Sequence, residues 1–360
     1  MITLQQEEIM KDIARLFDIK DEIAEVRPLG EGLINDTYLV ETKGDTDDYV
    51  LQRVNTNVFP DVAMVMQNID IVTSHIRKKL EDAGAQDLKH RVLQFVPSRA
   101  DASKLYVNVG GNFWRLMIYI DHTVTKQEVN PENAEAAGKA FGQFQKMLSD
   151  VPYTLGETIK DFHNMEFRLQ QLKEACKENR AGRLAQSEVQ ELLSELNKRA
   201  EEMTVAERLY REGQLPKRIC HCDTKVNNML FSEDGKEVLC VIDLDTVMPS
   251  FIFSDYGDFL RTAANTVAED EADFAKINFR EDIYLAFTRG YLSEAKAFLT
   301  PKEIEMLPFA VKLFPYMQSV RFLWDYLNGD KYWKVGYEKH NLVRAQNQFH
   351  YLEKIEHYFG

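Results

Sequence analysis

The sequence predicts an α+β fold in two parts, a first part built on an antiparallel sheet and a second part that is mostly helical. Up to about residue 121, short apolar runs alternate with glycine-rich or polar turns, which is the order of an antiparallel meander. From residue 132 onward, apolar residues recur three and four positions apart, as in amphipathic helices. We therefore expect one domain over residues 1–121 and a second over residues 122–360.

The elements of the first part follow from local patterns. A short amphipathic helix is expected within residues 1–18, and Pro60 opens a longer helix that runs to about Leu80. Gly110-Gly111-Asn112 has the composition of a hairpin turn. Apolar and alternating runs predict strands at residues 26–29, 35–41, 49–54, 92–96, 106–109 and 113–120.

In the second part, the helical spacing is interrupted once, between residues 219 and 245. Two short strand-like pieces flank the polar turn at residues 232–236 within this interruption. Helices are expected near residues 132–149, 163–178, 186–211, 272–297 and 302–328.

Composition and charge limit the classes of partner. The 360-residue chain carries 44 Lys and Arg against 58 Asp and Glu, a formal net charge of −14. An acidic surface repels phosphate backbones and anionic lipids, so neither nucleic acid nor a membrane is an expected partner. No apolar run approaches the roughly 20 residues of a transmembrane helix, and no signal-peptide pattern opens the chain. The four cysteines form no C-x-x-C pair, so reduced thiols and a cytoplasmic location are expected.

The polar loop after residue 219 is the most informative stretch of the chain. It contains His221, Asp223, Lys225 and Asn228, and Asp243 follows on the next strand-like piece. Loops bounded by strands are common places for binding residues. Carboxylate and amide oxygens from a few side chains, with room left for phosphate and water, are typical of a site for Mg²⁺ and a nucleotide. We therefore expect such a site here.

The spacing His-x-Asp-x-x-x-x-Asn, followed by Ile-Asp, resembles the catalytic loop and metal-binding aspartate of the kinase superfamily. Leu244-Asp245 follows the later aspartate where protein kinases have Phe-Gly. This difference points toward the aminoglycoside phosphotransferase-like small-molecule kinases, which include the choline kinases. The resemblance implies a two-lobed protein-kinase-like fold, with ATP and Mg²⁺ as cofactors.

The resemblance implies a role for each residue of the motif. Asp223 would accept the proton of the acceptor hydroxyl and aim its oxygen at the γ-phosphorus. Asn228 and Asp243 would bind Mg²⁺. Lys225 would either neutralise the phosphoryl group in transfer or be a solvated loop lysine, and His221 would order the loop.

Nucleotide-binding residues are expected in the first part. The turn at Gly30 and Gly32 would cover the phosphates with backbone N–H groups, and the backbone of Tyr119 and Ile120 would pair with adenine. Gln52 stands where the superfamily carries a phosphate-binding Lys or Arg. This substitution puts the usual Lys–Glu ion pair of the fold in question.

Further stretches between about residues 28 and 345 are similar to the N-acetylhexosamine 1-kinases of the same superfamily. This resemblance implies a sugar acceptor bound by Asn35, Asp245 and Arg321, although Asp245 could instead cap a turn. Arg321 also lies four residues before Asp325, where an intrahelical salt bridge is the alternative. The stretches include Asn55-Thr56, Phe59-Pro60-Asp61, Asp223-Thr224-Lys225, Asn227-Asn228, Asp243-Leu244-Asp245-Thr246, Arg321-Phe322-Leu323 and His340-Asn341-Leu342.

The expected function is ATP- and Mg²⁺-dependent phosphoryl transfer to the anomeric hydroxyl of N-acetylglucosamine or N-acetylgalactosamine, giving the sugar 1-phosphate. One alternative is the same chemistry on choline, homoserine, methylthioribose or an aminoglycoside. A second alternative is a module that binds ATP without turnover, which the presence of Gln52 suggests. A protein kinase is disfavoured because neither D-F-G nor A-P-E follows the catalytic loop.

Overall fold

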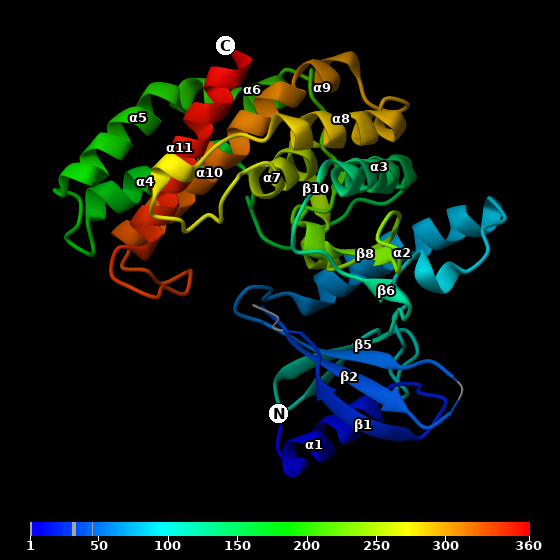
Figure 1. Ribbon diagram of the computed structural model, residues 1–360. Coiled ribbons are helices and arrows are strands. Elements are labelled where there is room, and N and C mark those ends of the chain that lie inside the picture. Colours follow the sequence, from blue (N-terminus) through cyan, green and yellow to red (C-terminus); the bar gives the residue numbers. More distant parts are fainter. Residues whose placement is uncertain (1, 31–33, 45) are drawn as a thin grey trace. The chain divides into compact units, whose positions relative to one another are not determined.

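The computed structural model describes residues 2–30, 34–44 and 46–360 (Figure 1). The chain forms two compact units. The first unit comprises residues 1–125, 150–159 and 229–248, and the second comprises residues 126–149, 160–228 and 249–360.

The first unit contains a five-stranded antiparallel sheet in the order β1-β2-β3-β5-β4, and the predicted meander is thereby confirmed. Residues 92–96, expected as a strand, instead form one isolated bridge between Phe95 and Met117. Pro97 ends this segment, so it makes too few backbone hydrogen bonds along β5 to count as a strand. The strands are β1 (Ile23–Pro28), β2 (Asp36–Thr42), β3 (Tyr49–Val54), β4 (Val107–Val109) and β5 (Asn112–Ile118).

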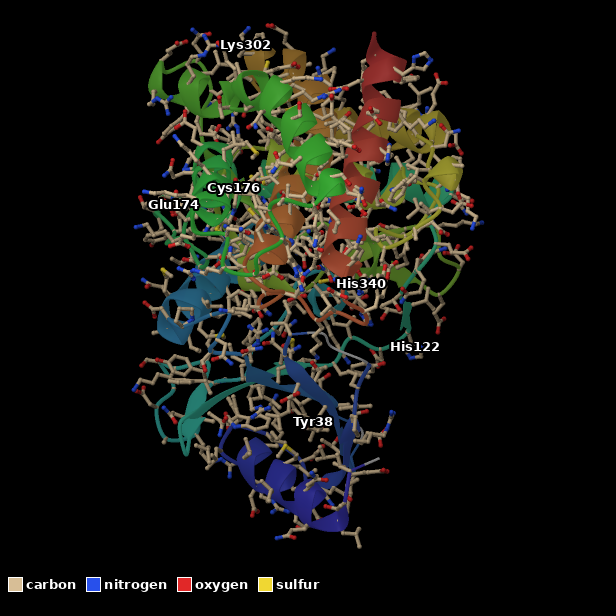
Figure 2. All side chains as sticks on the ribbon, turned by 90° about the vertical axis from the view of Figure 1, so that its left-hand side faces the viewer. Tyr38, His122, Glu174, Cys176, Lys302 and His340 are labelled. Carbon is tan, nitrogen blue, oxygen red and sulfur yellow. The ribbon has the colours of Figure 1, made fainter. Side chains whose placement is uncertain are left out.

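Helix α1 (Leu4–Ala14) begins with a capping box at Thr3 and packs on the sheet. Ile13 and Phe17 are buried in the core of this unit together with residues of β1, β2, β3 and β5. The rings of Tyr38 on β2 and Trp114 on β5 pack together, with centroids 6.3 Å apart. Figure 2 labels Tyr38 on its strand. These contacts form the hydrophobic core beneath the sheet that carries the polar residues described below.

The first unit also takes in two segments that follow residue 121, so its extent differs from the expected 1–121. Strands β6 (Thr123–Val124), β8 (Met229–Ser232) and β9 (Val238–Val241) form a second sheet. The Asn68 amide of α2 (Val62–Asp82) donates to the carbonyls of Gly156 and Val247, at 2.8 and 2.9 Å. Backbone pairing and these buried hydrogen bonds attach both later segments to the first unit.

The second unit is helical, with short strands β7 (Arg218–Cys220) and β10 (Met248–Ser250). α7 and α11 were not expected from the sequence. Among the described residues, no helix combines the length and apolar character needed to cross a bilayer. The helices are α3 (Pro131–Leu148), α4 (Met165–Glu178), α5 (Ser187–Met203), α6 (Val205–Arg211), α7 (Phe253–Ala263), α8 (Glu281–Ala295), α9 (Pro301–Glu305), α10 (Leu307–Leu327) and α11 (His340–Phe359).

Helices α3 and α8 lie side by side and approach closely at glycines (Figure 1). A Cβ atom on Gly290 would lie 2.0 Å from the carbonyl oxygen of Glu135, and one on Gly138 would lie 2.2 Å from that of Phe287. Because both neighbours are backbone atoms, these positions require glycine at the present helix separation.

Candidate active site

Asp255, in the first turn of α7, anchors the loop that follows β7. Its two carboxylate oxygens accept the backbone N–H groups of His221 and Cys222, at 3.1 and 2.8 Å. The Gln145 amide donates to the same carboxylate at 2.7 Å, and the Thr224 hydroxyl donates to the Asp255 carbonyl at 2.8 Å. Burial raises the pKa of Asp255, while the His221 ring and the backbone donors oppose that shift. The loop is therefore held by a buried carboxylate that sequence reasoning assigned no role.

The anchored loop has a strained backbone and a buried histidine. Cys222 has a φ of +66°, a conformation that non-glycine residues rarely adopt and that is often found at functional sites. The Asp223 N–H donates to His221 Nδ1 at 3.3 Å. The His221 ring also makes edge contacts with Phe141 and Phe144. This geometry supports the predicted ordering role of the histidine.

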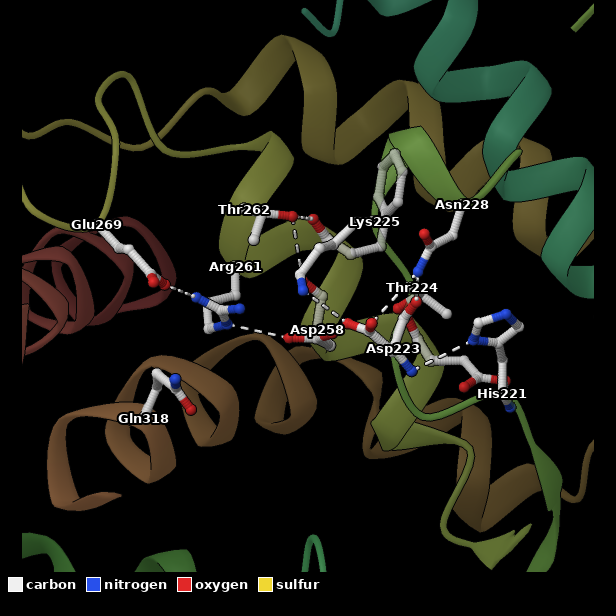
Figure 3. A network of polar contacts seen from close by, with 12 residues as sticks. His221, Asp223, Thr224, Lys225, Asn228, Asp258, Arg261, Thr262, Glu269 and Gln318 are labelled. Carbon is white, nitrogen blue, oxygen red and sulfur yellow. Dashed lines mark hydrogen bonds and ion pairs between the residues drawn. The ribbon is translucent and has the colours of Figure 1, made fainter. Parts of the chain in front are cut away.

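The structure brings together three predicted site residues, Asp223, Lys225 and Asn228 (Figure 3). Lys225 Nζ lies 2.9 Å from Asp223 Oδ1. The Asn228 amide nitrogen donates to the Asp223 carbonyl at 2.8 Å and lies 3.3 Å from its Oδ2. The Asp223 side chain is 26% exposed, so a ligand can still reach its carboxylate. Because the amide nitrogen of Asn228 faces Asp223, its amide oxygen is the atom that can bind a cation.

A row of alternately negative and positive side chains lies in the second unit (Figure 3). It consists of Asp223, Lys225, Asp258, Arg261 and Glu269. Burial lowers the pKa of the Lys225 ammonium, but the Asp223 and Asp258 carboxylates outweigh this effect and raise it above its ordinary value. Burial likewise raises the pKa of Asp258, but Arg261 and Lys225 outweigh it and lower that pKa. Arg261 donates to Asp258 at 3.0 Å and to Glu269 at 2.9 Å. Lys225 is therefore a charged ammonium next to the predicted base.

In the first unit, Asn35, Gln52 and Asp245 meet around Arg115, which sequence reasoning did not single out. The Asn35 amide donates to Asp245 Oδ2 at 2.7 Å. Arg115 donates to Asp245 Oδ1 through Nη1, and to Gln52 Oε1 through Nε and Nη2 at 3.0 and 2.9 Å. The side chains of Arg115 and Asp245 are 2% and 3% exposed. The sequence did contain a sign of this cluster, because Arg115 stands within the apolar stretch 113–118. A charged residue that is buried in such a strand needs a partner of opposite charge.

The other predicted residues of the first unit are placed as follows. Asp243 has φ and ψ of 60° and 59°, and Gly30 has a φ of +70°. Gly32 lies outside the described residues. The Tyr119 N–H donates to the Asp48 carbonyl at 2.8 Å, so an adenine contact there would use the Tyr119 carbonyl. The Ile120 side chain is buried.

Arg321 of α10 lies among aromatic rings in the second unit. Its guanidinium is 5.1 Å from the Phe162 ring centroid, 5.2 Å from that of Trp333 and 6.0 Å from that of Tyr332. It donates to Gln318 Oε1 at 3.0 Å. Burial lowers the pKa of this guanidinium. Aromatic rings beside a cation with several N–H donors can bind a polar ring-shaped ligand.

Asp325 does not form the intrahelical salt bridge considered from the sequence. Its Oδ1 accepts the N–H groups of Lys331 and Tyr332, both at 2.9 Å. Its Oδ2 accepts the N–H of Trp333 at 3.1 Å and the Asn341 amide at 3.0 Å. The side chain is fully buried. Asp325 therefore holds the loop that carries two of the rings around the arginine of α10.

A model of the phosphotransferase enzyme family APH matches residues 25–295 of the chain. The chain belongs to this phosphotransferase family. This phosphotransferase is also similar in structure to the aminoglycoside phosphotransferase of Alicyclobacillus acidocaldarius, with a TM-score of 0.61 and 14% identity over 97% of this chain and 95% of that one. The choline kinase LicA of Streptococcus pneumoniae matches with a TM-score of 0.56 and 14% identity, over 98% and 99% of the two chains.

Spectinomycin phosphotransferase APH(9)-Ia matches the phosphotransferase with a TM-score of 0.54 and 13% identity, over 99% of both chains. At sequence identities of 13–14%, the structural similarity to these proteins shows the fold alone. The predicted fold class, an antiparallel-sheet lobe followed by a mostly helical part of protein-kinase-like type, is confirmed. The protein is therefore a small-molecule phosphotransferase of the APH family.

Proposed function

We propose that this phosphotransferase transfers the γ-phosphoryl group of ATP to the anomeric hydroxyl of an N-acetylhexosamine, giving the sugar 1-phosphate. Family membership supports phosphoryl transfer to a small molecule. Nucleotide use is supported by similar structures: APH(9)-Ia and APH(2'')-Ib contain ADP, and LicA was solved with AMP. The described cysteines are free thiols, which supports the proposed location in the reducing cytoplasm.

The partly exposed Asp223 carboxylate is the observation that carries the proposed chemistry. The loop around it is anchored by buried hydrogen bonds to Asp255, so its position is defined before a substrate binds. A carboxylate has about four lone-pair positions, so Asp223 can accept an acceptor O–H while keeping its contact with Lys225. Asp223 would take the hydroxyl proton as the acceptor oxygen bonds to phosphorus. The adjacent Lys225 ammonium would offset negative charge on the phosphoryl oxygens.

The donor set fits a magnesium ion. We propose that the Asp243 carboxylate and the Asn228 amide oxygen hold it, because Mg²⁺ prefers hard oxygen ligands. The hydrogen bond from Asn228 to the Asp223 carbonyl leaves the amide oxygen as the ligand atom. That both residues bind one ion rests on the spacing of the motif. Bound there, a magnesium ion would supply positive charge to offset the negative charge of the nucleotide phosphates.

The nucleotide would bind to backbone groups of the first unit. We propose that the turn at Gly30 and Gly32 covers the phosphates, and that the carbonyl of Tyr119 and the backbone of Ile120 contact adenine. Gln52 would support this site indirectly, since its side chain accepts hydrogen bonds from the neighbouring strand.

The surroundings of Arg321 favour a neutral sugar over a quaternary ammonium acceptor. A choline-like ligand needs aromatic faces without a competing cation. Here the Arg321 guanidinium already lies against the rings of Phe162 and Trp333 and would repel such a ligand. Arginine donors suit sugar hydroxyl and acetamido oxygens, and the Tyr332 and Trp333 rings can pack on a sugar face. Asn35 and Asp245, expected from the sequence as acceptor contacts, are hydrogen-bonded to each other, and Asp245 also pairs with Arg115, so the acceptor contact proposed here is Arg321.

The substrate is tested by ³¹P NMR of the products formed with ATP, Mg²⁺ and separate acceptors. The acceptors are N-acetylglucosamine, N-acetylgalactosamine, choline, homoserine, methylthioribose and an aminoglycoside. A phosphomonoester coupled to an anomeric proton, formed from either hexosamine, is the expected product. A 6-phosphate product would reject the proposed position, and turnover of choline or homoserine alone would reject the sugar. The Asp223→Asn variant in the same reactions controls for contaminating kinases.

A further inference from the structure

A row of three polar side chains crosses the sheet of the first unit. Gln52 on β3 lies directly opposite Thr37 on β2 and Arg115 on β5 in the strand register. The Gln52 amide donates to the Thr37 hydroxyl at 3.1 Å and accepts two hydrogen bonds from Arg115. The residue in the usual place of a phosphate-binding cation therefore orients a cation on the neighbouring strand.

That cation pairs with a carboxylate two positions after the predicted metal ligand Asp243. Arg115 and Asp245 form a salt bridge with both side chains almost fully buried. Burying two charges costs about as much free energy as their attraction returns, so such a pair adds little stability compared with apolar residues. Its effect is positional, because Asp245 belongs to the 3₁₀ turn Leu244–Thr246 that follows Asp243.

The same carboxylate contacts the segment that precedes β2. The Asn35 amide donates to Asp245 at 2.7 Å, and its oxygen accepts the N–H of Asn55 at 3.0 Å. Asn55 also donates to the Ile34 carbonyl at 3.2 Å. Asp245 thus connects Arg115 of the sheet to residues 34–35, which precede β2.

We propose that Arg115, Gln52 and Asp245 form a positioning cluster that sets residues 34–35 and the Asp243 loop for nucleotide binding. This inference rests on the proposed use of ATP. Both Asp245 oxygens and both ends of the Asn35 amide already take part in hydrogen bonds, so these residues act through the elements they hold.

The proposal predicts that substitutions in the cluster weaken the binding of ATP and not that of the acceptor. In Arg115→Met and Asp245→Asn, KM for ATP and the Kd of ATP from calorimetry should both rise about tenfold or more, and KM for the acceptor should stay within about threefold. The double variant should lose little more than the worse single variant, because the two residues act as one unit. Arg115→Lys keeps the charge and should give an intermediate loss, since one ammonium cannot reproduce the forked contacts with Gln52 and Asp245.

The exposed pair of Arg53 and Asp36 supplies a matched control on the same strands. These side chains are 46% and 47% exposed, as expected from strand alternation that turns Arg53 away from Gln52. Arg53→Met with Asp36→Asn should leave KM for ATP within about twofold. Far-UV circular dichroism establishes that each variant is folded, and Arg115→Lys serves where Arg115→Met does not fold.

Different results separate the two proposals. Unchanged ATP affinity in folded Arg115→Lys and Asp245→Asn, beside a wild type that binds ATP, would overturn the cluster and leave the proposed function standing. A raised acceptor KM with unchanged ATP affinity in Asp245→Asn would return Asp245 to the acceptor site and also overturn it. A wild type that binds no ATP would reject the proposed function and the cluster with it.

Discussion

Replacing Asp325 with asparagine should release the loop that follows α10. The carboxylate accepts three backbone N–H groups, from Lys331, Tyr332 and Trp333, and one amide N–H from Asn341. Asparagine keeps one oxygen, which can retain the two donors now on Oδ1. Its NH₂ group would then face the Trp333 N–H and the Asn341 amide, which are both donors.

The magnitude follows from these four contacts. Hydrogen bonds to a charged group contribute about 1.5–3 kcal/mol each, and a buried donor left unsatisfied costs about 1–3 kcal/mol. Two lost bonds and a weakened remaining pair should lower the free energy of unfolding by about 3–5 kcal/mol. Because Tyr332 and Trp333 flank Arg321, the acceptor KM should rise while the ATP KM stays unchanged.

Urea unfolding and steady-state kinetics measure these two effects. Asp282→Asn is a matched control, since its carboxylate is 52% exposed and pairs with Arg280 at the surface. That control should change the unfolding free energy by less than about 1 kcal/mol. A loss below about 1 kcal/mol in Asp325→Asn, with an unchanged acceptor KM, would refute the anchoring role.

Three further substitutions test the packing, a buried acid and the proposed base. Gly290→Ala should lower the free energy of unfolding, measured by thermal denaturation, by about 1–3 kcal/mol because the added Cβ meets the Glu135 carbonyl. Gly336→Ala should leave it unchanged, since the nearest atom to the added Cβ is His340 Nδ1 at 3.8 Å. Burial raises the pKa of Glu207 to about 7, above its unfolded value, so its ionisation opposes folding as pH rises from about 4.5 to 7. Glu207→Gln should therefore stabilise the protein at pH 8 and not at pH 4, as urea unfolding at both pH values would show. Asp223→Asn should lower kcat by about 10²–10⁴-fold with unchanged ATP affinity by calorimetry, and activity close to wild type would remove it as the base.

Short-range patterns carried the sequence-based prediction of the fold. The meander and most helices were predictable because strand and helix periodicities repeat within a few residues. α7 was missed although apolar residues recur along it at helical spacing, and the burial of Asp255, Asp258 and Arg261 on it could not be read from the sequence. The prediction of a strand at residues 92–96 was wrong, because only an isolated bridge joins this segment to β5.

The candidate site likewise has one part that the sequence identified and one part that only the fold brings together. Asp223, Lys225 and Asn228 lie within six consecutive residues, so one loop conformation brings them together and the motif identified them. Arg115 and Asp245 are 130 positions apart, and nothing near either residue indicates the other. The place of such pairs is set by how strands and loops pack.

The sequence alone therefore determined the order of the elements, the acidic surface and the local motif around Asp223. Those properties depend on nearest neighbours in the chain and on side-chain chemistry. Tertiary structure decided that Asp255 holds the motif, that Arg115 is the buried cation beside Gln52, and that Asp325 holds a loop. Each of these carboxylates or cations is stable in the interior only because distant segments supply its partners, and only the folded chain places them there.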